Sequence, residues 1–300
     1  MGRSVSNSYF TLVASKKDPA SSSMAEFLID RTGFSKNGQD LNFRNSHDRE
    51  GKAYVTKDCS NDIFDLYIYK NIKLHFSHNS LLLYLDNLDT IYPDCLAFIF
   101  LSRHSSESRI PTLTCHFTGN FDANRFGGIP RELGMCYPYL QKQYMKEINA
   151  NRLSVPHYEI VIEATHHGPT SLKKPSLFIE IGSTEKQWTD KNAASVVCDS
   201  LMSVLYKINV NSKCKDVGIA LGGTHYPTKF NQLLLTSQFG LAAVAARHNL
   251  YSVDECMINQ MISKSIEKVE YAIVDRKGLG KEKIRILELI EKKDLELLEL

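Results

Sequence analysis

Residues 158–188 constrain this 300-residue chain more than any other stretch. Two apolar runs, 158–164 and 176–182, have the length of β-strands, and each ends in a turn of small and polar residues. Each run also carries a carboxylate, Glu163 in the first and Glu180 in the second. Structural proteins seldom combine two adjacent histidines, here His166 and His167, with two carboxylates in one short unit, so we expect a functional site here. The alternative is that Glu163 and Glu180 are solvent-facing strand positions.

Outside this unit, apolar runs of strand length alternate with segments of helical periodicity. This alternation predicts an α/β fold with a mixed, largely parallel sheet flanked by helices. No linker or internal repeat divides the chain, so we expect a single domain over residues 1–300. The expected strands cover residues 9–14, 63–76 (one or two strands), 95–101, 112–117, 158–164, 176–182, 216–221 and 271–275. The expected helices cover residues 18–33, 131–151, 189–207, 231–247, 252–269 and 281–300, and the polar residues 34–52 are expected to form a surface loop.

The composition excludes several classes of protein. A net charge of +2 excludes a globally basic nucleic-acid-binding protein but leaves room for a local basic patch. The seven cysteines are scattered without a CxxC pair, which argues against a disulfide framework and a thiolate zinc knuckle. No apolar run approaches the roughly 18 residues that a membrane-spanning helix needs. We therefore expect a protein of the reducing cytoplasm.

Histidines occur in four separate turns, each at the end of a predicted strand or just after it. They are His104, His116, His166, His167 and His225. In an open α/β sheet, ligands bind in the crevice outside the carboxyl ends of the strands, so we expect all four turns to surround one pocket there. A single histidine after a strand is usually structural, and the interpretation depends on the four turns together. His157 and His248 lack this context and are interpreted as structural.

The same turns carry groups that suit an anion such as phosphate. Glycines let backbone N–H groups approach a ligand, short polar side chains donate hydrogen bonds, and basic side chains neutralise charge. The candidates are Arg103, Thr118, Asn120, Gly182, Ser183, Lys186, Gly222, Gly223 and Lys229. Each is also an ordinary turn or surface residue, so only their concurrence favours a binding site.

Two chemistries suit such a cluster, and spacing along the chain does not decide between them. Several imidazoles and a carboxylate can hold a zinc ion, which lowers the pKa of a bound water to about 7. Alternatively, one histidine acts as a general base on water and a carboxylate orients it. The sequence has no HExxH, GxSxG, P-loop or GxGxxG motif that would favour one chemistry.

At these residues the chain resembles the D-aminoacyl-tRNA deacylases of the type shared by archaea and plants. The resemblance is carried by four histidine-containing blocks: IFLSRHSSES, LTCHFTGNF, EATHHGPTSLKKPSLFIEIGSTEKQW and GIALGGTHYPTKF. The opening TLVASKKDPASSSMAEFL and the closing VDRKGLGKEKIRIL are also similar, so the resemblance covers roughly residues 9–290. It implies an enzyme that hydrolyses the ester between a D-amino acid and the terminal ribose of tRNA. It also implies a zinc ion and a fold similar to peptidyl-tRNA hydrolases and nucleoside phosphorylases.

This resemblance suggests roles for the candidate residues. Catalytic groups are expected among His166, His167, Glu163 and His225, and metal ligands among His104, His116, His166, His225 and Glu180. The anion-binding candidates would hold the aminoacylated CCA end. The expected enzyme is a cytoplasmic monomer that binds tRNA and neither membrane nor DNA. Two alternatives stay open: another zinc- or histidine-dependent hydrolase or phosphorylase acting on a small substrate, and a non-catalytic RNA-binding module.

Overall fold

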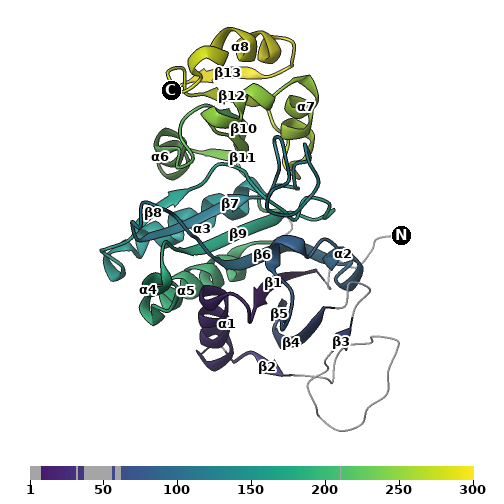
Figure 1. Cartoon of the computed structure of the whole chain (residues 1–300), viewed down its shortest axis with the longest axis vertical. Coiled ribbons are helices and arrows are strands. Elements are labelled where there is room, and N and C mark those ends of the chain that lie inside the picture. Colours follow the sequence, from purple (N-terminus) through teal and green to yellow (C-terminus); the bar gives the residue numbers. More distant parts are fainter. Residues whose placement is uncertain (1–7, 32, 37–55, 58–61, 210) are drawn as a thin grey trace.

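The computed structural model describes residues 8–31, 33–36, 56–57, 62–209 and 211–300. Within these residues, two β-sheets with surrounding helices make up the fold (Figure 1). The strands are β1 (Tyr9–Ser15), β2 (Ser35–Lys36), β3 (Thr56–Lys57), β4 (Ile63–Tyr69), β5 (Ile72–Ser77), β6 (Cys95–Arg103), β7 (Thr112–Phe117), β8 (Glu159–Ile162), β9 (Ser176–Gly182), β10 (Asp216–Leu221), β11 (Phe239–Ala245), β12 (Tyr271–Val274) and β13 (Glu296–Glu299). The α-helices are α1 (Pro19–Arg31), α2 (Leu88–Ile91), α3 (Pro138–Ala150), α4 (Glu185–Trp188), α5 (Lys191–Lys207), α6 (Thr228–Thr236), α7 (Glu255–Ser263) and α8 (Lys283–Glu291). Short 3-10 helices are η1 (Leu82–Tyr84), η2 (Arg152–Ser154), η3 (Arg247–Ser252) and η4 (Gly280–Glu282).

The larger sheet has the strand order β2-β4-β5-β1-β6-β9-β7-β8, and β3 pairs with β4. Strands β5, β1, β6 and β9 run parallel to one another, whereas β7 is antiparallel to β9 and β8 is parallel to β7. The central strand β6 is apolar on both faces. Ile99 packs in the main hydrophobic cluster, while Phe98 and Phe100 pack in a second cluster with residues of η1 and α2. A continuous apolar run is what a strand covered on both faces requires.

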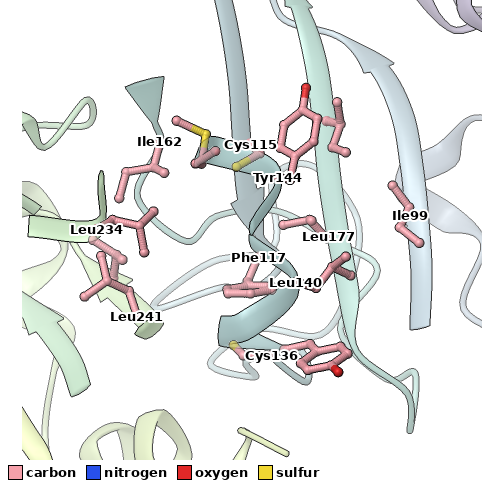
Figure 2. Packing of buried hydrophobic residues seen from close by; sticks show 14 of the residues in the cluster. Ile99, Cys115, Phe117, Cys136, Leu140, Tyr144, Ile162, Leu177, Leu234 and Leu241 are labelled. Atoms are coloured by element: carbon pink, nitrogen blue, oxygen red, sulfur yellow. The ribbon is translucent and has the colours of Figure 1, made fainter. Parts of the chain in front are cut away.

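The second sheet has the order β11-β10-β12-β13, is entirely parallel, and lies at the opposite end of the molecule from α1 (Figure 1). Helix α3 packs against α5 of the larger sheet and against β11 and α6 of the second. Leu140 of α3 lies in the same apolar cluster as Leu177 of β9 and Leu241 of β11 (Figure 2). One hydrophobic core therefore continues from the first sheet into the second.

A buried lysine strengthens this connection. Lys142 of α3 donates from Nζ to the backbone carbonyl oxygens of Leu234, Ser237 and Phe239 at 2.9, 2.8 and 2.7 Å. These carbonyls belong to the end of α6 and the start of β11, where the chain turns into the second sheet. The ammonium thus satisfies one carbonyl oxygen in the last turn of α6 and two where the chain leads into β11.

The structure confirms the α/β class with a mixed, largely parallel sheet. The helix expected at residues 231–247 is wrong in its second half, because FGLAAVA forms β11. Such an apolar run of small and branched residues fits a buried strand and a buried helix equally well by periodicity. Among the described residues, no helix combines the length and apolar character needed to span a bilayer.

The C-terminal expectation also needs correction. The helix expected over residues 281–300 ends at Glu291, and Glu296–Glu299 forms β13 beside β12. Alternating Lys and Glu suggested one helix, but Leu295, Leu298 and Leu300 pack partly buried against the main hydrophobic cluster, while Leu297 is exposed. Of the loop expected at residues 34–52, the described part contains β2, and residues 37–52 lie outside the described residues.

Candidate active site

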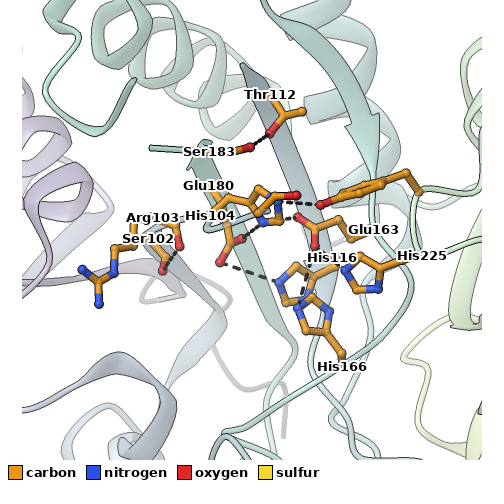
Figure 3. Close-up of polar contacts among 12 residues, drawn as sticks. Ser102, Arg103, His104, Thr112, His116, Glu163, His166, Glu180, Ser183 and His225 are labelled. Atoms are coloured by element: carbon orange, nitrogen blue, oxygen red, sulfur yellow. Dashed lines mark hydrogen bonds and ion pairs between the residues drawn. The ribbon is translucent and has the colours of Figure 1, made fainter. Parts of the chain in front are cut away.

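One face of the larger sheet carries three of the predicted site side chains. Ser102 of β6 and Thr114 of β7 flank Glu180 of β9 in the ladder. Side chains two residues apart on a strand share a face, so His104 and His116 lie on the face of Glu180. Figure 3 shows these three side chains pointing toward one another.

This arrangement differs from the crevice expected at the carboxyl ends of the strands. Because β7 is antiparallel to β9, His104 and His116 approach Glu180 from opposite directions along β9. The carboxyl ends of β7 and β8 therefore point in the opposite direction to those of β6 and β9. The expectation that all these strands end on the same side of the sheet is therefore wrong, and the site lies on the face of the sheet.

The segment after β8 carries a carboxylate and two histidines from the larger sheet to the second. The N–H of Ala164 donates to the carbonyl oxygen of His225, and the N–H of Thr165 donates to that of Val244, both at 2.9 Å. The Thr165 hydroxyl accepts from the N–H of Val244 at 3.0 Å. These bonds fix the segment against the strand ends of the second sheet and bring His225 to the site.

Close packing shapes the THHGP turn that follows. His167 has a φ of 46°, in the left-handed region that non-glycine residues seldom adopt. A Cβ atom at Gly168 would lie only 2.3 Å from the backbone nitrogen of Gly128. The turn therefore requires glycine at this position, and it holds His167 in a conformation that the chain would otherwise avoid.

Glu163 and His225 form a carboxylate–imidazole pair (Figure 3). Nε2 of His225 lies 2.8 Å from Oε2 of Glu163, whose side chain is fully buried. Burial raises the pKa of Glu163, but the hydrogen bond from His225 and the charges of neighbouring histidines outweigh it and hold that pKa at about 2. An ionised carboxylate only accepts, so His225 donates from Nε2 and, in the neutral ring, keeps a lone pair on Nδ1. This is the geometry of a general base with the carboxylate that orients it.

His104 lies between the two buried carboxylates. Its Nδ1 is 3.2 Å from Oε1 of Glu163 and 3.3 Å from Oε2 of Glu180, and its Nε2 is 2.7 Å from the Tyr226 hydroxyl. Burial lowers the pKa of His104, but the hydrogen bond to Glu180 and the charge of Glu163 raise it above its ordinary value. Burial raises the pKa of Glu180, but the neighbouring imidazoles of His104 and His116 outweigh burial and lower it. With both ring nitrogens engaged, His104 compensates the charge of the two carboxylates.

Backbone carbonyl oxygens hold the other three imidazoles in one tautomer. Nδ1 of His116, His166 and His167 lies 3.1, 2.8 and 2.8 Å, respectively, from the carbonyl oxygen of a residue one or two positions away. A carbonyl oxygen only accepts, so each Nδ1 carries the proton and each neutral ring has its lone pair on Nε2. Ring centroids are 4.0 Å apart for His116 and His166, and 4.3 Å apart for His166 and His167.

The three imidazoles differ in charge. Burial, and then the charge of His116, lower the pKa of His166 well below its ordinary value and that of His167 to about 4. Burial also lowers the pKa of His116, but Glu180 outweighs burial and raises it. Nε2 of His116 is buried without a hydrogen-bond partner among the described residues, and Oε1 of Glu180 lies 3.8 Å from it. Buried atoms of this kind suit a ligand that the protein itself does not provide.

Three groups of side chains in this cluster could hold a metal ion, with ligand atoms within 4.8 Å of one another. The groups are His116, His166 and His167; Glu163, His166 and His225; and His104, Glu163 and Glu180. Imidazole nitrogens and carboxylate oxygens are ligands that zinc takes. The all-histidine group fits zinc best, because each ring donates its other N–H to a carbonyl oxygen, as zinc-binding imidazoles do. In the other groups, His225 and His104 are already engaged by carboxylates.

Two adjoining cavities open beside the cluster. The smaller, of about 340 Å³, is lined by Gly119, Asn120, Phe121, Asp122, Ala123, Arg125, Phe126, Thr165, His166, His167, His225, His248, Asn249 and Tyr251. The larger, of about 560 Å³, is lined by Gly223, Thr224, His225, Arg247, His248, Tyr251, Leu279, Lys281 and Glu282. His225, His248 and Tyr251 belong to both linings, so the Glu163–His225 pair lies where the cavities meet.

Comparison with known proteins identifies the family. The family model described as D-aminoacyl-tRNA deacylase matches residues 91–298. The chain belongs to this family. A D-aminoacyl-tRNA deacylase of Cenarchaeum symbiosum is 41% identical over 201 residues, which cover 67% of this chain and 76% of the relative. That of Staphylothermus marinus is 33% identical over 287 residues, which cover 93% of this chain and 94% of the relative. The crystal structure of a conserved protein of unknown function has a TM-score of 0.81 and 27% identity, and the match covers 97% of this chain and 95% of that one. The family inferred from the sequence is confirmed.

The deacylase chain brings some of the predicted substrate-binding residues to the cavities. Asn120 lines the smaller cavity, and its Nδ2 donates to the carbonyl oxygens of Gly127 and Ile129 at 2.9 and 3.2 Å. Gly223 lines the larger cavity, directly after Gly222. Thr118 is fully buried, and its hydroxyl has no hydrogen-bond partner among the described residues.

Two more of these residues support the site from β9. A Cβ atom at Gly182 would lie 2.7 Å from Cβ of His104, so glycine makes room for that ring. The hydroxyl of Ser183 donates to the carbonyl oxygen of Ile110 at 2.7 Å. Both residues are buried and belong to neither cavity lining.

The three predicted phosphate-binding cations lie outside both cavity linings. Arg103 is exposed, with its guanidinium 5.1 Å from the ring centroid of Trp188. Lys186 is exposed on α4. Lys229 is bound to Asp275 at 2.8 Å and to the carbonyl oxygen of Leu300 at 2.9 Å.

Sequence reasoning missed Arg247, His248 and Tyr251, which line the cavities. Arg247 and His248 follow β11 just as the other site histidines follow strands, so the signal was present in FGLAAVAARHN. Assigning this run to a helix concealed it. His248, interpreted as structural, has its ring centroid 6.1 Å from that of His225.

Proposed function

We propose that this chain hydrolyses the ester bond between a D-amino acid and the terminal ribose of tRNA where the two cavities meet. Membership of the deacylase family supplies the reaction and the substrate class. The observation that carries the assignment of the site is the Glu163–His225 pair. Its buried carboxylate holds an imidazole in the wall that both cavities share.

In the proposed reaction, His225 is the general base. Its Nε2–H stays hydrogen-bonded to Glu163, and its Nδ1 takes a proton from the water that attacks the ester carbonyl carbon. Glu163 stabilises the imidazolium that forms. The C–O bond to the ribose then breaks, and His225 returns the proton to the ribose oxygen. The products are the free D-amino acid and tRNA.

We further propose that Nε2 of His116, His166 and His167 hold a zinc ion. Bound zinc would lower the pKa of a water ligand and polarise the ester carbonyl. The chain's own contribution is to keep these rings in the required tautomer through three carbonyl oxygens. Burial keeps His166 and His167 neutral, which leaves their lone pairs available.

The wider setting of the reaction is also part of the proposal. The chain acts on tRNA as a monomer in the cytoplasm. Recognition of tRNA needs only a local basic surface, which agrees with the net charge of +2.

A deacylation assay with D-tyrosyl-tRNA and L-tyrosyl-tRNA tests the proposed reaction. The parent releases D-tyrosine much faster than L-tyrosine, and His225→Gln lowers kcat on the D-ester by about 10²–10⁴-fold, as expected for loss of a general base. His157→Gln, at an exposed histidine, serves as control. A change of less than threefold for His225→Gln contradicts the assigned base, and absence of hydrolysis of the D-ester by the parent contradicts the function.

Metal analysis tests the zinc proposal separately. We expect bound zinc in the purified parent, its loss in His166→Ala, and slower hydrolysis after treatment with a chelator. If the parent holds no zinc and the chelator leaves the rate unchanged, the metal assignment is wrong and the histidine base stands alone.

A further inference from the structure

We infer that the larger cavity binds the terminal nucleotide of tRNA, and that Arg247 and Lys281 bind the 5′-phosphate of this nucleotide. This inference rests on the proposed function, because it places that substrate relative to the reacting ester. The cavity volume of about 560 Å³ lies within the range of roughly 300–1,000 Å³ that small-molecule sites occupy.

The charge of the cavity wall supports an anionic ligand. Arg247 and Lys281 are exposed, and neither forms an ion pair with a carboxylate among the described residues. Glu282 is the acidic residue of this lining, and Nη2 of Arg285 binds its Oε2 at 2.8 Å. The two cations therefore lack an ion-pair partner among the residues that the structure describes. A planar guanidinium and an ammonium are the groups that bind phosphate most readily.

Glycines fix the position of the arginine. The N–H of Arg247 donates to the carbonyl oxygen of Gly223 at 2.9 Å. A Cβ atom at Gly280 would lie 2.8 Å from both Nε and Nη2 of Arg247, so glycine lets the guanidinium lie against the backbone. A Cβ atom at Gly278 would lie 2.2 Å from the nitrogen of Gly223. The glycine turn after β10 and the glycine turn after β12 thus pack together beside Arg247. This packing holds the guanidinium at the cavity.

The shared wall sets the orientation of the substrate. In an aminoacylated terminal nucleotide, the ribose lies between the ester and the 5′-phosphate. We place the ester at His225 and the amino acid in the smaller cavity. The nucleotide then occupies the larger cavity. The exposed ring of Tyr251 offers a contact surface for the base in that lining, and Arg247 and Lys281 meet the phosphate.

Binding of adenosine 5′-monophosphate and of adenosine to the full chain tests the phosphate contact without catalysis. Titrations followed by ligand-observed NMR should show that the parent binds the monophosphate at least about 10-fold more tightly than adenosine. Arg247→Gln removes most of this preference and Lys281→Gln reduces it. Arg152→Gln, at an exposed arginine outside both linings, retains it. Equal affinity of the parent for the two ligands overturns the inference, as does a preference that both variants retain in full.

Kinetics on small esters relates this contact to the reaction. The substrates are 2′(3′)-O-(D-tyrosyl)adenosine and its 5′-phosphate. For the parent, kcat/KM is higher on the phosphorylated ester, and Arg247→Gln lowers the ratio of the two values by about 10–100-fold, mainly through KM. An equal loss on both esters indicates a structural role and overturns the inference. If the parent hydrolyses neither ester yet still binds the monophosphate more tightly than adenosine, the nucleotide-binding site is supported and the proposed function fails.

Discussion

The histidine cluster on the larger sheet and the cavity wall of the second sheet are built in opposite ways, although His225 belongs to both. In the cluster, titratable side chains are buried or half-buried, and most of their polar atoms are held by another side chain or a backbone carbonyl. In the cavity wall, Arg247 and Lys281 are exposed cations without a carboxylate partner among the described residues, and Gly280 lies against the guanidinium of Arg247.

This difference separates two tasks. Groups that stabilise charge during a reaction act best when they are oriented in advance in a site of low dielectric. Groups that recognise a phosphate must be free to exchange water for the ligand. Substitutions in the cluster are therefore expected to change kcat and stability, and substitutions in the wall to change KM.

Glu163→Gln should have the largest effect. The amide keeps the shape of the side chain but does not stabilise an imidazolium on His225, so kcat on D-tyrosyl-tRNA should fall by about 10³-fold, with little change in KM. Glu159→Gln, at an exposed carboxylate of the neighbouring strand β8, is the matched control. A loss of less than tenfold, or a loss confined to KM, would remove the distinction between the two regions.

His104→Asn should have the next largest effect, on stability. Without this imidazole, Glu163 and Glu180 are buried together with less compensating charge, and the free energy of unfolding at pH 7.5 should fall by about 3 kcal/mol. The folded-state pKa of His104 is raised, so its stabilising charge is fully present below the ordinary value of 6.5 and is lost as pH rises through the raised value, and the destabilisation should be larger at pH 5 than at pH 7.5. Urea unfolding at pH 7.5 and pH 5 measures both effects, with His157→Asn as control. An equal destabilisation at the two pH values would contradict the role of His104 as a compensating charge.

The histidine cluster could be predicted from the sequence because its signal is local. Each site histidine lies at the end of an apolar run or just after one, and the runs 112–117, 176–182 and 216–221 form strands with those same bounds. What the sequence did not contain is the direction of the strands. Whether β7 runs with or against β9 depends on how the connection from β6 crosses the sheet, and no residue in TLTCHF encodes it. The histidines were therefore expected together because their strands were assumed to run in the same direction, and the structure shows that β7 does not.

The cavity wall was missed because its determinants are far apart in the chain. Lys229 was expected to bind phosphate, but Asp275, 46 residues away, already binds it. Arg247 and Lys281 meet at one cavity only because β11 and β12 flank β10. The ambiguity of FGLAAVA between helix and strand then concealed the turn that carries Arg247 and His248.

Lys142→Met tests the attachment between the two regions. Loss of the ammonium leaves the carbonyl oxygens of Leu234, Ser237 and Phe239 without this donor, which should lower the free energy of unfolding by about 2–3 kcal/mol. Hydrogen exchange should increase most in α6 and β11. Lys146→Met, at an exposed lysine of the same helix, should change stability by less than about 0.5 kcal/mol. Increased exchange spread evenly over both sheets would show that Lys142 does not specifically join them.

The smallest expected effect concerns the pH dependence of the cluster. The pKa of His167 is lowered from 6.5 to about 4 by burial and by the charge of His116, so the unfolded state binds a proton that the folded state does not between these pH values. Stability should therefore fall as pH falls through this window, and His167→Gln should reduce the loss between pH 7 and pH 5 by about 1–2 kcal/mol. Urea unfolding of chelator-treated protein at both pH values measures this change in stability. His248→Gln, at the exposed histidine of the cavity wall, should reduce the loss less, because its ring is exposed to water, although burial and the charge of His225 lower its pKa. Equal effects of the two substitutions would mean that cluster and wall do not differ in how strongly they hold their histidines neutral.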